Sequence, residues 1–155
     1  MAEQVLFAED FASFPLGAFP YDREHSAMGE YNYWPNPGYH GRWYDPIVNY
    51  GYSGPSWMVT QSDGVNYMEQ CRVLTPGQGL NACPALVAGD KDWGDYTFSA
   101  DVRLFSPLER VGLLFRYHTS LHHYAFFLSG AGAELLYVDK AERRLLASAP
   151  FSPDC

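Results

Sequence analysis

Residues 110–148, "RVGLLFRYHTSLHHYAFFLSGAGAELLYVDKAERRLLAS", decide the fold that we predict for this chain. Four short apolar runs, at 110–118, 122–130, 133–139 and 143–148, are separated by turn segments such as "GAG" and "KAE". Strands joined by such short turns pair with their neighbours along the chain. The stretch therefore predicts an antiparallel meander.

We expect successive side chains of the first run to alternate between the two faces of this sheet. The apolar face then carries Val111, Leu113, Phe115 and Tyr117. The other face carries Gly112, Leu114, Arg116 and His118. One face is thereby predicted to be core and the other to be polar.

Further strands are predicted towards the N-terminus, where "SDG" and "TPGQG" indicate turns. These strands are expected at 5–11, 56–61, 65–73, 83–88 and 95–105. The last of them, "DYTFSADVRLF", has the clearest alternation, with Tyr96, Phe98 and Val102 on the same face.

Residues 15–55 form a long aromatic insertion that is rich in Pro and Gly and shows no helical periodicity. We find no convincing amphipathic helix or internal repeat in the chain. The class is therefore all-β, with an antiparallel sandwich favoured over a closed barrel. At 155 residues, the chain has room for one such domain over 1–155.

Charge and composition exclude several classes of partner. The formal net charge is -8, with only 10 Lys and Arg residues, so we expect no nucleic acid and no anionic membrane as a partner. No apolar stretch approaches the roughly 20 residues that cross a bilayer. The N-terminus lacks the pattern of a signal peptide, which predicts a cytoplasmic protein or a secreted one whose signal has been removed.

Three cysteines, Cys71, Cys83 and Cys155, show no CxxC or Cys/His metal spacing. Reduced structural thiols are the interpretation that we favour. A disulfide between Cys71 and Cys83 is the alternative.

The segment 92–130, "DWGDYTFSADVRLFSPLERVGLLFRYHTSLHHYAFFLSG", carries a resemblance to a known superfamily. A Trp is followed by Asp-Tyr opening an alternating strand, then by a Gly-led strand ending Phe-Arg-Tyr, then by a strand with Tyr and Phe. In this pattern, and in "LFAEDF" near the start, the chain resembles the concanavalin A-like lectin/glucanase superfamily. The most similar branches are the laminin-G-like and the 3-keto-disaccharide hydrolase-like ones.

The resemblance implies a jelly-roll sandwich that binds carbohydrate on its concave sheet face. Such a fold needs strands beyond Ser148. Unless the first half of the chain supplies these strands, the resemblance also implies an incomplete C-terminus or an open sheet edge through which the chain associates. The function that we expect is that of a carbohydrate-binding module in a polysaccharide-processing protein, with an oligosaccharide or polysaccharide as partner.

An enzyme is the alternative function, although the glucanase pattern of alternating acidic residues and the lyase Gln-x-His pattern are both absent from the sequence. The enzyme would be a glycoside hydrolase or a polysaccharide lyase acting on a uronate-containing or oxidised saccharide. Arg116 would bind the carboxylate, and His118 or a tyrosine would be the catalytic base. A structural or protein-binding sandwich is a second alternative.

The candidate binding residues on the predicted polar face combine charges with an aromatic ring that can stack on a pyranose. They are Asp101, Arg103, Arg116, His118 and Tyr124, with His123 as an alternative to Tyr124. A cross-strand ion pair from Asp101 to Arg116 or Arg103, on a solvated sheet, is the competing interpretation.

The insertion adds candidates that would rim the same face, and the competing interpretation is that its rings form a local core. These candidates are Trp34, Arg42, Trp43 and Tyr44, together with Asp45. We expect no cofactor except a structural calcium ion, for which Asp10 is a ligand candidate. The competing interpretation, which we favour, is that Asp10 is a simple carboxylate at the end of a strand. The adjacent histidines of "LHHY" point to opposite faces of a strand and so do not share a metal ion.

Overall fold

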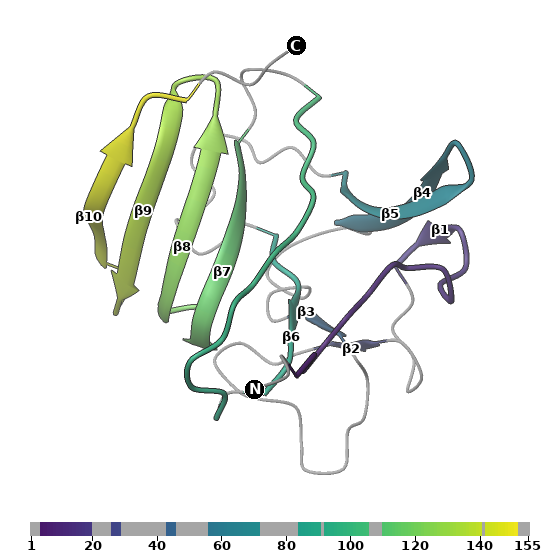
Figure 1. The fold of residues 1–155 in the computed structure, drawn as a ribbon, viewed down its shortest axis with the longest axis horizontal. Coiled ribbons are helices and arrows are strands. Elements are labelled where there is room, and N and C mark those ends of the chain that lie inside the picture. Colours follow the sequence, from purple (N-terminus) through teal and green to yellow (C-terminus); the bar gives the residue numbers. More distant parts are fainter. Residues whose placement is uncertain are drawn as a thin grey trace. The chain divides into compact units, whose positions relative to one another are not determined.

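The computed structural model describes residues 4–19, 26–28, 43–45, 56–71, 84–90, 92–105, 110–140 and 142–151, without the side chains of 26–28 and 44–45. Throughout these ranges the regular structure is strand, with no helix. Two antiparallel sheets and a small mixed sheet contain the strands (Figure 1). The all-β class is therefore confirmed, whereas the jelly-roll topology and the role of the aromatic insertion stay predictions.

Two compact units make up the chain, Met1–Asp90 and Lys91–Cys155. The first unit contains β1 (Gly17–Ala18), β2 (Ser26–Met28), β3 (Trp43–Asp45), β4 (Trp57–Ser62), β5 (Val65–Gln70) and β6 (Val87–Ala88). The second unit contains β7 (Arg110–Thr119), β8 (His122–Ser129), β9 (Gly132–Asp139) and β10 (Glu142–Ala149). The prediction of one sandwich domain is not tested by this division.

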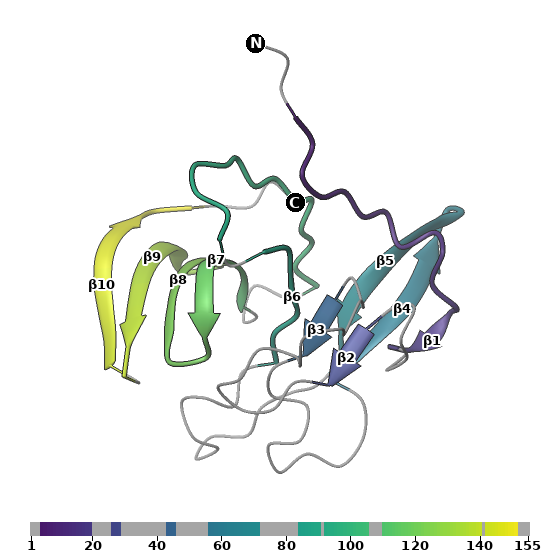
Figure 2. The same ribbon diagram turned by 90° about the horizontal axis from the view of Figure 1, so that it is seen from below.

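The second unit is the predicted meander. Its four strands lie in the order β10-β9-β8-β7, every pair antiparallel, as Figures 1 and 2 both show. Two residues separate each strand from the next, the commonest connection in β-hairpins. The apolar runs of the sequence therefore match the four strands closely.

A β-bulge in β7 changes which way its last side chains point. Phe115 pairs with Tyr124 and Thr119 with His122, so three residues of β7 lie opposite one residue of β8. Arg116 begins this bulge with a φ of 48°, in the left-handed region that few residues other than glycine adopt.

The bulge overturns part of the predicted face assignment. Tyr117, expected beside Phe115, instead stacks on His123, with ring centres 5.4 Å apart. His118, expected with Gly112, instead lies against His122, with ring centres 5.5 Å apart. Strict alternation fails here because each extra residue in the strand shifts the side chains that follow it.

The first unit contains a hydrophobic core around the hairpin of β4 and β5. Asp63 and Gly64 connect these strands with φ angles of 52° and 79°, the positive values of the type I′ turn that an Asp-Gly pair favours. Phe14, Phe19 and Val59 are buried together beside this hairpin. The "SDG" turn prediction is confirmed.

Two predicted strands are absent. Residues 5–11 and 95–105 have no strand pairing, although the second segment alternates clearly. Phe98 and Val102 are 50% and 44% exposed. Alternation shows which side chains can share a face, but a strand also needs a neighbour for its backbone hydrogen bonds.

Strand β10 is an edge of the meander, and all of its residues are exposed. No strand of the described residues pairs with its outer side. A β-bulge between Leu145 and Ala147 interrupts its pairing with β9. Association through this edge stays a prediction.

Gly112 in β7 gives the first testable prediction. A Cβ at this position would lie 2.3 Å from the Phe127 ring and 2.7 Å from the Phe126 carbonyl oxygen. We expect Gly112→Ala to lower the free energy of unfolding by about 1–3 kcal/mol, because the ring and the strand must both shift. Urea denaturation measures this loss.

Gly94→Ala is the matched control, since nothing lies within 4 Å of its added Cβ. We expect a change below about 0.5 kcal/mol for the control. Equal losses in the two variants would contradict the close packing of Phe127 on Gly112.

Candidate functional site

Three neighbouring strands of the meander bring a row of aromatic side chains together on one face. The register places Phe115, Tyr124 and Tyr137 directly opposite one another on β7, β8 and β9. The ring centres of Phe115 and Tyr124 are 5.5 Å apart and those of Tyr124 and Tyr137 are 4.8 Å apart. All three side chains are half-buried, so each ring keeps an accessible part. We call these residues the ring row and their side of the sheet the ring face.

A cleft of about 400 Å³ lies beside the ring row within the second unit. It is lined by Gly94, Tyr96, Phe98, Leu113, Phe115, Arg116 and Phe126. Phe115 thus belongs to both the cleft and the ring row. The lining has the composition of a small-molecule site, in which apolar and aromatic surfaces surround a few polar groups.

Tyr96 and Arg116 connect the 92–105 segment to the meander. The backbone amide of Arg116 donates a hydrogen bond to the Tyr96 hydroxyl at 2.9 Å. The Arg116 guanidinium lies 3.5 Å from Asp95, and its side chain is 53% exposed. Its five N–H donors exceed what one distant carboxylate accepts, so the guanidinium can also bind a ligand oxygen at the cleft.

Polar groups lie beside Tyr137, the ring of the row that comes from β9. His122 Nδ1 is 3.5 Å from Asp139 Oδ1 and 3.5 Å from the Tyr137 hydroxyl. Partial burial, with smaller effects from Asp139 and Tyr124, raises the pKa of Tyr137 above its ordinary value of 10.0. The phenol therefore keeps its proton at neutral pH and can donate or accept a hydrogen bond.

The predicted binding residues are only partly brought together. Tyr124 is in the ring row, Arg116 lines the cleft, and His118 contacts His122. Asp101 and Arg103 belong to the 95–105 segment that is not a strand. Arg103 lies 5.5 Å from the Phe105 ring, and the described residues include no ion pair between Asp101 and either arginine.

The insertion candidates are described in part. Trp34 and Arg42 lie outside the described residues, while the backbones of Tyr44 and Asp45 form β3 with Trp43. Trp43 is half-buried, its ring stacks at 5.7 Å on Phe11, and its Nε1 donates to Glu9 at 3.2 Å. This packing is what the local-core interpretation predicts for Trp43.

Asp10 has a local role in the structure. Its carboxylate accepts a hydrogen bond from the Ala12 amide at 2.9 Å, which stabilises a turn. In the described parts of the chain, no three His, Cys, Asp or Glu residues are grouped to hold a metal ion. A structural calcium ion at Asp10 stays a prediction, as does the Cys71–Cys83 disulfide, because Cys83 lies outside the described residues.

Five aromatic residues of the site were missed by the sequence analysis as binding candidates. They are Tyr96, Phe98, Phe115, Phe126 and Tyr137. Their alternation was visible, but it assigned Tyr96 and Phe115 to a buried core. The rings at i and i+2 in "HYAFFL" and the Tyr in "ELLYVD" are a usable signal once the strands are known to be half-buried.

Comparisons of the chain with protein-family models, with curated proteins and with solved structures found no match. The resemblance to the concanavalin A-like superfamily is therefore carried by the sequence pattern alone. Within the described residues, no helix is long and apolar enough to span a membrane.

His123, on the face opposite the ring row, gives a prediction of pH dependence. Burial lowers its pKa from the ordinary value of 6.5, although a hydrogen bond to the Thr119 carbonyl, at 3.1 Å, raises it. Because the unfolded chain then binds the proton more readily, His123 stabilises the fold above about pH 6.5 and loses this effect as the pH falls below it.

We expect His123→Gln to reduce the loss of stability between pH 7.5 and pH 5, because glutamine can still donate to the Thr119 carbonyl but does not titrate. Urea midpoints of both proteins at the two pH values measure the difference. The same pH dependence in both proteins would contradict the burial of a neutral His123.

Proposed function

We propose that this chain is a carbohydrate-binding module of the concanavalin A-like type, a β-sandwich of jelly-roll topology that serves a polysaccharide-processing protein. The ring row carries the proposal. Three half-buried rings from neighbouring strands form an apolar strip, which suits the C–H face of a pyranose, and polar groups lie at both of its ends.

The cleft would determine where the sugar binds and which sugar is selected. Phe115 would stack at the cleft wall, while the Arg116 guanidinium would bind vicinal hydroxyls or a uronate carboxylate with paired hydrogen bonds. At the other end, the Tyr137 hydroxyl and the Asp139 carboxylate offer a donor and an acceptor for further hydroxyl groups. The strip would thereby bind more than one sugar ring.

Tyr124, at the centre of the ring row, provides the test. We expect oligosaccharide binding in the micromolar to millimolar range, and we expect Tyr124→Ala to weaken it about tenfold, since one stacked ring contributes about 1–1.5 kcal/mol. A glycan array identifies the ligand, and calorimetry with that ligand measures the affinity.

Tyr124→Phe is the matched control, because it keeps the ring and removes only the hydroxyl. It should bind within about twofold of the unchanged protein if stacking is the main interaction. An array with no hit, or full binding by Tyr124→Ala, would exclude the ring row as a sugar site.

An enzyme acting on a uronate-containing or oxidised saccharide is a second candidate function, which the position of Arg116 in the cleft favours. His118 would be the base in a glycoside hydrolase or lyase reaction. If so, His118→Ala should abolish turnover while leaving binding nearly unchanged. Turnover that survives this substitution would exclude His118 as the base, and a lack of turnover in the unchanged protein would leave binding as the function of the site.

A further inference from the structure

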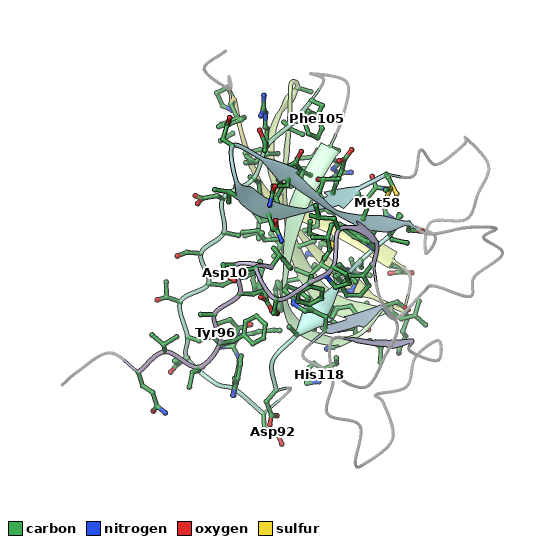
Figure 3. All side chains as sticks on the ribbon, turned by 90° about the vertical axis from the view of Figure 1, so that its right-hand side faces the viewer. Asp10, Met58, Asp92, Tyr96, Phe105 and His118 are labelled. Atoms are coloured by element: carbon green, nitrogen blue, oxygen red, sulfur yellow. The ribbon has the colours of Figure 1, made fainter. Side chains whose placement is uncertain are left out.

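His118 and His122 come from the two strands of one hairpin, and their rings meet at the end of the ring face. Their ring centres are 5.5 Å apart, with the planes inclined by 54°. The His118 side chain, which is labelled in Figure 3, is exposed. The His122 side chain is 45% exposed. Both imidazoles are therefore accessible from solvent.

The surroundings of His122 distinguish its two ring nitrogens. Nδ1 faces β9, where it is 3.5 Å from both Asp139 Oδ1 and the Tyr137 hydroxyl. The two nitrogens of an imidazole point in roughly opposite directions, and β8 lies between β9 and β7. Nε2 of His122 is thus directed away from β9, on the side from which His118 approaches.

This arrangement has two features of a metal-binding histidine. The first is the carboxylate at the second ring nitrogen, which metal-bound histidines commonly have and which fixes the tautomer and the ring orientation. The second is the spacing, because two imidazoles bound to one tetrahedral zinc ion at 2.0–2.1 Å have ring centres about 5 Å apart. The observed separation is close to this value.

We propose that His118 and His122 form a site for a divalent transition metal ion of the zinc and copper class, for which imidazole is a preferred ligand. Asp139 is a positioning residue that orients His122. Two protein ligands leave the remaining coordination positions to water, so the site is open and exchangeable. The proposal uses the end of the ring face and does not depend on sugar binding.

The bulge in β7 explains why adjacency in the sequence does not reveal this pair. His122 and His123 are neighbours but point to opposite faces, as alternation requires. His118 is four residues away from His122, and the bulge brings their rings together. His123 is therefore a control that the chain itself supplies, with the same chemistry on the other face.

Calorimetric titration of the tag-free full chain with ZnCl₂ tests the proposal. We expect one binding event that weakens at least about tenfold in His118→Gln and in His122→Gln, and that disappears in the double variant. Asp139→Asn should weaken it about 10–100-fold, as loss of an outer carboxylate commonly does. His123→Gln should leave the affinity unchanged.

Electron paramagnetic resonance of the unchanged protein with Cu²⁺ adds a measurement that needs no variant. A spectrum with two imidazole nitrogens bound to the copper ion is expected. Absence of Zn²⁺ binding, binding that persists in the double variant, or a copper spectrum with fewer than two nitrogens would overturn the site. An unchanged affinity in Asp139→Asn would overturn the role of Asp139.

Discussion

Backbone hydrogen bonding across three tight hairpins is the constraint on which the candidate site depends. The two-residue connection sets the register of β8 with β9, and the bulge in β7 shifts the register of β7 with β8 so that Phe115 lies opposite Tyr124. Phe115, Tyr124 and Tyr137 come together for this reason and not because they attract one another over a distance. A shift of one residue in either hairpin would move a ring to the other face.

The meander could be predicted from the sequence because each of its strands combines a short apolar run with a recognisable turn. The Asp63–Gly64 turn was foreseeable for the same reason, since a positive φ at both positions suits these residues. The prediction of a strand at 95–105 was wrong because alternation is a property of side chains, whereas a strand also needs a partner for its backbone hydrogen bonds. Here the Arg116 backbone amide donates a hydrogen bond to the Tyr96 hydroxyl, so a bond to a side chain takes the place of backbone pairing between strands.

The site was predicted less completely than the meander. Arg116 and His118 were predicted to lie on the polar face with Tyr124, but this face assignment was wrong because nothing in "FRYHT" indicates a bulge that starts at a non-glycine residue with positive φ. Whether these three residues bind a ligand stays a prediction. Asp101 and Arg103 were chosen on the assumption of a strand that does not form. Tyr137 was overlooked because a tyrosine within an apolar run is expected to be buried in the core. Only its register opposite Tyr124 shows that it belongs to the ring row.

The two units differ in how far along the chain their paired strands lie, and this difference has a kinetic consequence. Every pairing of β7 to β10 joins neighbours in sequence, so each hairpin closes a short loop at small entropic cost. Trp43 and Ala88, in contrast, pair across the antiparallel contact of β3 with β6, which closes a long stretch of chain. Folding rates fall as contacts become less local. The meander should therefore form early, and formation of the β3–β6 contact should limit the rate at which the first unit folds.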